Sequence, residues 1–277
     1  EGKTFGLVLS KKEDLVVGDF PELPKHESIE ILHTHIIGEK AYTEPISLLK
    51  NELKTIARKW HPSITLKDSK IGPTPFRGNQ GGGYTLEALL GIKRNSSKKP
   101  DKYGFEIKAF KKNGKISLFT PTADLGEEGK LSFRKFMNKY GRKGKKSDGR
   151  IVFTGAHKFS EKNNSTNLVL DIRGYDFKLK EFHDDLSQIY IGLFNYTNSK
   201  LISGWSFIKL LSSWSEKHAS TCYVEYEKRK NLDQSKKHDF DYFFTGRVIF
   251  GTGTHIANFF NGVNNGIIIY DPGHTIY

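Results

Sequence analysis

The stretch that decides the fold is Tyr103-Gly104-Phe105-Glu106-Ile107-Lys108-Ala109-Phe110, with Pro100-Asp101 just before it. Apolar residues at 105, 107 and 109 alternate with Glu106 and Lys108, and this period of two is that of a β-strand. The two charged side chains therefore share one face of the predicted strand. Asp101 lies at the turn that leads into the strand, so we expect two carboxylates and one ammonium at the same strand edge.

This stretch has the form PD-x4-ExK, which is typical of metal-dependent nucleases. Two carboxylates make a hard oxygen site for Mg²⁺, and a neighbouring lysine can orient a water beside a phosphate. We expect Asp101 and Glu106 to bind Mg²⁺ with the backbone carbonyl of Ile107, and Lys108 to orient the attacking water. The triplet alone is equally consistent with an ion pair on the wet face of an edge strand.

A glycine-rich segment, Gly78–Gly83, precedes a predicted short helix. Thr85 is the expected N-cap, leucines follow at helical spacing, and Gly91 is the expected stop. Glu87 would then lie in the first turn. Its carboxylate is either stabilised there by the helix dipole, or it is a third acid of the metal site. In the second case it is a candidate to bind a second metal ion, or a water that is bound to the first ion. The glycines could let the backbone approach a phosphate paired with Arg77, or form a plain turn.

Residues 78–108 resemble the MvaI/BcnI family of Type II restriction endonucleases, which share the fold of the mismatch-repair nicking enzyme MutH. The resemblance is strong over residues 48–141, thin but colinear beyond them, and absent from residues 1–45. The matching pieces are Leu48 to Trp60, Gly78-Asn79-Gln80-Gly81-Gly82, Thr85-Leu86-Glu87-Ala88-Leu89-Leu90, and Pro100-Asp101 through Glu106-Ile107-Lys108.

The resemblance implies an α/β fold, a PD-(D/E)xK (MutH-like) nuclease core with a central mixed sheet flanked by helices, plus a C-terminal DNA-recognition lobe. We expect an N-terminal extension of unknown role over residues 1–45, a catalytic core over 46–160, and a recognition lobe with the remaining core strands over 161–277. Glu87, Asp101, Glu106 and Lys108 are the expected catalytic residues.

The implied activity is sequence-specific, Mg²⁺-dependent cleavage of double-stranded DNA that leaves 5′-phosphate ends. Two alternatives stay open: a methylation-directed or mismatch-repair-like DNA nickase, and a catalytically silent DNA-binding module. The resemblance further implies a monomer, with a dimer left open, a prokaryotic cytoplasmic location, and a cognate DNA methyltransferase in the same host.

The charge of the chain favours a polyanionic partner. Among 277 residues, 44 Lys and Arg against 31 Asp and Glu give a formal net charge of +13 and a pI near 9.5. Phosphate neutralisation supplies most non-specific affinity for nucleic acid, although acidic membranes and proteins also attract such a chain. Residues 141–150 hold no apolar side chain, so Lys143, Lys145 and Lys146 are candidates for a DNA-contacting arm; a solvated loop is the alternative.

Other candidate DNA contacts are scattered along the sequence. Asn79 lies in the glycine-rich segment beside Arg77, and Lys111 opens a basic turn that we expect to be a hairpin into a strand over 116–120. Arg247, His255 and Asn258 carry donors and acceptors suited to base edges in the major groove, although ordinary turn and strand roles explain them as well.

The rest of the sequence predicts further helices and limits the possible disulfides and membrane segments. Further helices are predicted over residues 44–60, 131–140 and 205–214. The single cysteine, Cys222, excludes an intrachain disulfide and reads as a buried small hydrophobe. No apolar run approaches the length of a membrane span, so no membrane partner is expected.

Overall fold

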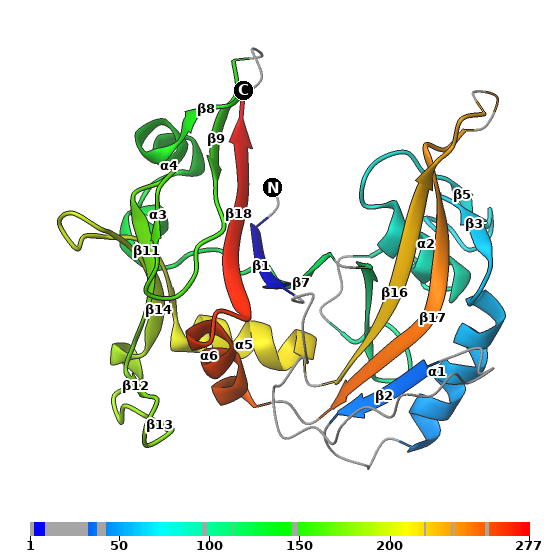
Figure 1. Ribbon diagram of the computed structural model, residues 1–277, viewed down its shortest axis with the longest axis horizontal. Coiled ribbons are helices and arrows are strands. Elements are labelled where there is room, and N and C mark those ends of the chain that lie inside the picture. Colours follow the sequence, from blue (N-terminus) through cyan, green and yellow to red (C-terminus); the bar gives the residue numbers. More distant parts are fainter. Residues whose placement is uncertain are drawn as a thin grey trace. The chain divides into compact units, whose positions relative to one another are not determined.

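The computed structural model describes residues 3–8, 33–37, 43–95, 99–112, 114–145, 149–218, 220–233, 235, 237–252 and 255–277 (Figure 1). The chain divides into two units that do not follow sequence order. We call residues 10–116 and 216–254 the site unit, and residues 1–9, 117–215 and 255–277 the companion unit. No helix among the described residues is long and apolar enough to cross a membrane.

A mixed sheet forms the frame of the site unit, as expected. Its strands, in spatial order, are β2 (His33–Ile37), β17 (Phe240–Thr252), β16 (Ser220–Lys230) and β6 (Glu106–Lys111). β16 and β17 are antiparallel, whereas β6 runs parallel to β16 and β2 runs parallel to β17. A short strand, β3 (Trp60–Pro62), also pairs with β17. Among the described strands β6 lies at one edge of this sheet.

The expected hairpin after β6 is wrong. A turn does form, because the Gly114 N–H donates to the Lys111 carbonyl at 2.7 Å. The next strand, β7 (Lys115–Phe119), nevertheless belongs to a sheet of the companion unit. β6 pairs instead with β16, whose residues Cys222 and Val224 lie opposite Ile107 and Ala109. Burial of matched apolar faces outweighs the local turn signal here.

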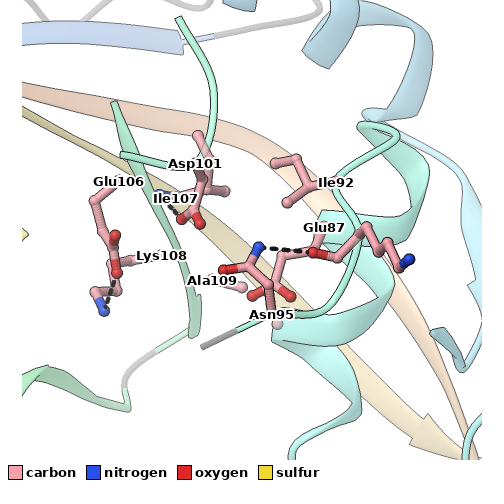
Figure 2. Close-up of a pocket in the computed structure, with 10 residues that line it drawn as sticks. Glu87, Ile92, Asn95, Asp101, Glu106, Ile107, Lys108 and Ala109 are labelled. Atoms are coloured by element: carbon pink, nitrogen blue, oxygen red, sulfur yellow. Dashed lines mark hydrogen bonds and ion pairs between the residues drawn. The ribbon is translucent and has the colours of Figure 1, made fainter. Parts of the chain in front are cut away.

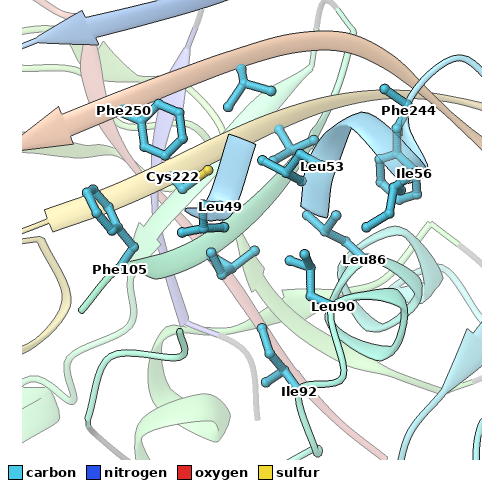
Figure 3. Close-up of a cluster of buried hydrophobic side chains, with 14 of the residues drawn as sticks. Leu49, Leu53, Ile56, Leu86, Leu90, Ile92, Phe105, Cys222, Phe244 and Phe250 are labelled. Carbon is cyan, nitrogen blue, oxygen red and sulfur yellow. The ribbon is translucent and has the colours of Figure 1, made fainter. Parts of the chain in front are cut away.

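Two helices cover one face of the site-unit sheet, α1 (Thr43–Ile56) and α2 (Gly81–Leu89). Their apolar side chains join those of β6, β16 and β17 in one buried cluster (Figure 3). Its labelled members are Leu49, Leu53, Ile56, Leu86, Leu90, Ile92, Phe105, Cys222, Phe244 and Phe250. The strands β4 (Ile64–Thr65) and β5 (Thr74–Pro75) pair with each other between the two helices in sequence.

The start of α2 differs from the expectation, and this changes the position of Glu87. The helix begins at Gly81, so the glycines form its first turn and Thr85 is not the N-cap. It ends as predicted, because Gly91 has a φ of +72° and its N–H donates to the Ala88 carbonyl at 3.1 Å. Glu87 therefore lies in the last turn, where the helix dipole disfavours a negative charge.

The described residues of the companion unit form two sheets and a strand pair. One sheet has the order β7, β1 (Lys3–Val8), β18 (Ile268–Ile276), β9 (Ile151–Thr154), β8 (Arg142–Lys143). The other has the order β10 (Lys162–Asn163), β11 (Leu168–Arg173), β14 (Tyr190–Asn195), β15 (Leu201–Ser206), and the pair is β12 (Tyr175–Asp176) with β13 (Glu181–Phe182). Its helices are α3 (Gly126–Lys130), α4 (Phe133–Tyr140), η2 (Leu186–Gln188), α5 (Phe207–His218) and α6 (Ile256–Asn264).

The helix expected over residues 205–214 begins later than predicted. Trp205 ends up in β15, is almost fully buried, and donates its indole N–H to the Pro121 carbonyl at 3.1 Å. The helix starts at Phe207, where Asp124 accepts hydrogen bonds from the N–H and the hydroxyl of Ser206 at 3.0 and 2.6 Å. A long-range polar contact, which no local pattern reveals, sets this boundary.

Candidate active site

A pocket of about 260 Å³ lies at the edge strand of the site unit and brings together the four predicted catalytic residues (Figure 2). Glu87 comes from α2, Asp101 from the turn before β6, and Glu106 and Lys108 from β6 itself. The other lining residues are Gly83, Ile92, Lys93, Asn95, Ile107 and Ala109.

The strand fixes Glu106 and Lys108 as a pair. Both lie on the face of β6 opposite Ile107, since alternate residues of a strand point to opposite faces. The Lys108 Nζ lies 2.8 Å from the Glu106 Oε1. Glu106 is buried, whereas the Lys108 side chain stays 24% exposed, so its ammonium can meet a ligand from solvent.

Asp101 and Glu87 reach the pocket from the other side of the strand. The Ile107 N–H donates to the Asp101 Oδ2 at 2.9 Å, which ties the aspartate back to the middle of the motif. Ile107 packs in the cluster that holds Leu86 of α2, and Glu87 projects from that helix. Figure 2 shows Glu106 and Lys108 on one side of β6, with Asp101 and Glu87 on the other. The acids thus surround an edge strand.

Negative charge accumulates in this pocket. Burial, together with the negative charges of Asp101 and Glu106, raises the pKa of Glu87 to about 7. The positive charges of Lys108 and Arg94 act against this rise but do not cancel it. The three carboxyl groups therefore repel one another when they are ionised, and a bound cation would reduce this repulsion.

The donor set fits a hard divalent cation in kind. Mg²⁺ prefers oxygen ligands, and the pocket offers three carboxyl groups. In the side-chain positions of the structure, however, no three His, Cys, Asp or Glu of the described residues lie close enough together to hold a metal ion. Glu106 is paired with Lys108, and Asp101 with the Ile107 N–H. The structure therefore shows three acidic side chains that line one pocket. Which of them bind the metal ion stays a prediction.

The predicted DNA contacts lie outside this pocket, as far as the structure describes them. In the site unit, Arg77, Asn79, Lys111 and Arg247 are all exposed. The guanidinium of Arg77 lies 3.8 Å from Asp239, and that of Arg247 lies 3.5 Å from Glu225. Each of these two charges is therefore partly offset at the surface.

The predicted contacts of the companion unit lie on two of its segments. Lys143 and Lys145 are exposed, and Lys146 falls outside the described residues. His255 is exposed at the N-cap of α6 and makes no capping hydrogen bond with its side chain. Asn258, half-buried in the first turn of α6, donates its N–H to the His255 carbonyl at 3.0 Å. Their contact with DNA stays a prediction.

The glycines before Glu87 have a packing role that the sequence did not reveal. A Cβ added to Gly81 would lie 2.5 Å from the Tyr242 hydroxyl, and one added to Gly82 would lie 2.6 Å from the Tyr226 ring. Gly83 has open space instead, and it lines the pocket. Two of the three glycines thus let α2 approach the sheet closely, and only the third faces the acids.

Two further features were not predicted. Asn95 and Lys93 line the pocket, and no short motif marks them. Thr85, the expected cap, instead accepts a hydrogen bond from the Ile64 N–H at 3.1 Å and donates to the Ile64 carbonyl at 3.4 Å. It joins α2 to β4, and so helps to hold the helix that carries Glu87.

Comparisons with known proteins identify the family and the fold of the chain. The sequence pattern of the MvaI/BcnI restriction endonuclease family matches residues 50–277. Among solved structures, a complex of the restriction endonuclease MvaI with its cognate DNA substrate has a TM-score of 0.59 and 18% identity, over 84% of this chain and 98% of that chain. MvaI in the absence of DNA gives a TM-score of 0.35 and 16% identity, over 82% of each chain. No curated protein gives a significant match.

The first of these structures shows the fold, which is that of a restriction endonuclease of the PD-(D/E)xK type with a mixed central sheet. The family match spans most of the chain and includes the whole pocket. The chain belongs to the MvaI/BcnI restriction endonuclease family.

Proposed function

We propose that the chain is a Mg²⁺-dependent Type II restriction endonuclease, which hydrolyses phosphodiester bonds of a specific duplex sequence and leaves 5′-phosphate ends. Family membership implies a sequence-specific DNA endonuclease. The observation that carries the finer proposal is the convergence of Glu87, Asp101, Glu106 and Lys108 on one pocket beside β6, the edge strand among the described strands of this sheet.

Each of these residues has a proposed role. Asp101 and Glu106, with the backbone carbonyl of Ile107, would hold Mg²⁺, and Glu87 is the further acid for a second ion. When bound, Mg²⁺ stabilises negative charge on phosphoryl oxygens and activates the attacking water. Lys108 would orient that water and offset the charge that develops on the phosphate. Glu106 holds the Lys108 ammonium within hydrogen-bonding distance, so the lysine is oriented before substrate binds.

DNA binding is proposed to involve both units. The excess of basic residues supports a broad electrostatic attraction to phosphate. Arg77, Asn79 and Lys111, which we propose to contact DNA, lie in the site unit with the pocket. Residues 161–277 are proposed to supply the recognition lobe. We propose that the enzyme acts as a monomer in a prokaryotic cytoplasm beside a cognate DNA methyltransferase.

The test is cleavage of supercoiled plasmid by purified Lys108→Ala and Asp101→Ala proteins in Mg²⁺. Both variants should lose roughly 100-fold or more of the cleavage rate, while DNA binding in EDTA stays close to that of the unmodified protein. Lys112→Ala is a matched control, since Lys112 is an exposed lysine of the same unit that pairs with Glu227 at 2.7 Å. Full cleavage by Lys108→Ala would remove the proposed role.

The products separate the proposed function from its alternatives. Linear plasmid with discrete ends is expected of a restriction endonuclease, whereas nicked circles that depend on methylation indicate a nickase. No cleavage of any plasmid in Mg²⁺ or Mn²⁺ would indicate a DNA-binding module without activity.

A further inference from the structure

Asp101 is attached to β6 through a tight turn that needs support from outside. Lys102 and Phe105 pair across this turn through two backbone hydrogen bonds, of 3.0 Å and 2.8 Å. Between them, Tyr103 and Gly104 have φ values of +50° and +80°, as in a type I′ turn. Glycine adopts this conformation readily, but tyrosine does so rarely. The turn that places the aspartate is therefore not favoured by its own sequence at position 103.

The support comes from Glu52 of α1. The Tyr103 hydroxyl donates to the Glu52 Oε1 at 2.7 Å, and the Lys102 Nζ lies 2.6 Å from the Glu52 Oε2. Both carboxylate oxygens are thus occupied by consecutive residues of the turn. Burial by itself would raise the pKa of Glu52, but the hydrogen bonds from Lys102 and Tyr103 and the lysine charge lower it overall. The carboxyl therefore stays charged and keeps both contacts near neutral pH.

The Lys102 ammonium makes a second contact, with α2. It donates to the Leu90 carbonyl at 2.6 Å. Leu90 is the C-cap of α2, and carbonyls at a helix end lack partners within the helix. Glu87 lies three residues earlier in the same helix. One ammonium thus joins the turn that holds Asp101, the helix that holds Glu87, and α1.

We infer that Lys102, held by Glu52, is a positioning residue that sets the separation of Asp101 and Glu87 across the pocket. This inference rests on the proposed function, because it concerns the acids assigned to Mg²⁺ there. Lys102 does not line the pocket, so it acts through the elements that it joins. Groups that hydrogen-bond directly to metal ligands typically change metal affinity or activity by roughly 10- to 100-fold when they are removed. Lys102 is bonded to Glu52 and to the Leu90 carbonyl, which are one step further from the ion, so we expect an effect at the lower end of this range.

The experiment compares Glu52→Gln, Lys102→Met and Lys102→Arg with the unmodified protein. Binding of Mn²⁺ alone, without DNA, is followed by electron paramagnetic resonance, and the Mg²⁺ concentration for half-maximal cleavage is measured separately. Glu52→Gln and Lys102→Met should weaken Mn²⁺ binding and raise the Mg²⁺ requirement by roughly 10-fold. Lys102→Arg, which keeps the charge and can donate to both partners, should recover most of the loss. DNA affinity in EDTA should not change.

Three comparisons make the outcome decisive. Lys112→Met removes an exposed lysine–glutamate pair of the site unit and should leave Mn²⁺ binding unchanged. Glu52→Gln keeps the size of the side chain, so it provides the measurement if Lys102→Met does not fold. Folded Glu52→Gln protein with normal Mn²⁺ affinity and a normal Mg²⁺ requirement would overturn the inference, provided that Asp101→Ala is inactive. Cleavage by Asp101→Ala would instead overturn the proposed function.

Discussion

Gly82 offers a direct test of why α2 begins with glycines. In Gly82→Ala the new Cβ would lie 2.6 Å from the Tyr226 Cζ and 2.7 Å from its Cε1, closer than atoms in folded proteins approach. The tyrosine ring has little room to move, because it packs edge-on against Tyr242 with ring centroids 5.3 Å apart. Either the ring or the helix must shift, and a shift of the helix moves Glu87.

The magnitude follows from two opposing effects. Overpacking a buried site typically costs about 1–3 kcal/mol, while alanine is favoured over glycine in a helix by about 1 kcal/mol. We expect Gly82→Ala to lower the free energy of unfolding by up to about 2 kcal/mol. The adjacent Gly83→Ala is the matched control, since it lies in the same helix and its added Cβ would meet nothing within 4 Å. It should stabilise the protein by about 0.5–1 kcal/mol.

Urea unfolding of the three proteins in EDTA, with fluorescence and circular dichroism as probes, gives the comparison. The free energy of unfolding must fall with urea concentration at the same slope in all three proteins. Only then does a shift of the unfolding midpoint measure a change in stability. Should both variants be stabilised equally, the close contact between α2 and β16 would be disproved. If Gly82→Ala instead lost DNA affinity at full stability, the glycine would serve phosphate approach rather than packing.

The remaining predictions concern titration and reactivity. In EDTA, Glu87→Gln should be more stable than the unmodified protein at pH 8 by about 1–2 kcal/mol, after a discount for its partial exposure, and similar to it at pH 5. The sign follows because a pKa raised from 4.5 to about 7 gives stability that is complete below 4.5 and lost as pH rises through 7; identical pH profiles would contradict it. For His157, burial lowers the pKa from 6.5 to about 4, so the protein should lose up to about 3 kcal/mol as pH falls from 6.5 to 4. His157→Gln should reduce that loss in urea unfolding at the two pH values, and an unchanged loss would show that other groups cause it. Burial also raises the pKa of Cys222, so a maleimide should label it only in denaturant; rapid labelling of the native protein would contradict its burial.

Local patterns predicted the core of the candidate site. The alternation around Ile107 placed Glu106 and Lys108 on one face, and the short distance along the chain kept Asp101 close to the strand, where it accepts a hydrogen bond from the Ile107 N–H. Glu87 was also placed in the same pocket, although in the wrong turn of its helix, because the sequence does not show that glycines at 81–83 can begin a helix when tyrosines pack over them. Local chemistry was therefore visible, but close packing was not.

Long-range pairing was the part that sequence could not supply. Asn113-Gly114 is a strong turn signal, and it led to a hairpin prediction for β6 that is wrong. The actual partner, β16, lies far along the chain and runs parallel to β6, and no turn specifies such a pairing. The boundary of α5 failed for a similar reason, since Asp124 fixes it from another part of the chain.

The position of β6 at the edge of its sheet affects how readily the purified protein self-associates. Among the described strands β6 has no neighbour on its outer side. Edge strands can pair with strands of other molecules, and charged side chains discourage such self-association. Lys108, which is partly exposed and is held by the buried Glu106, therefore also limits self-association at this edge. Inactive proteins made by neutralising both residues should oligomerise more readily at high concentration than those made by changing Asp101, which lies before the strand.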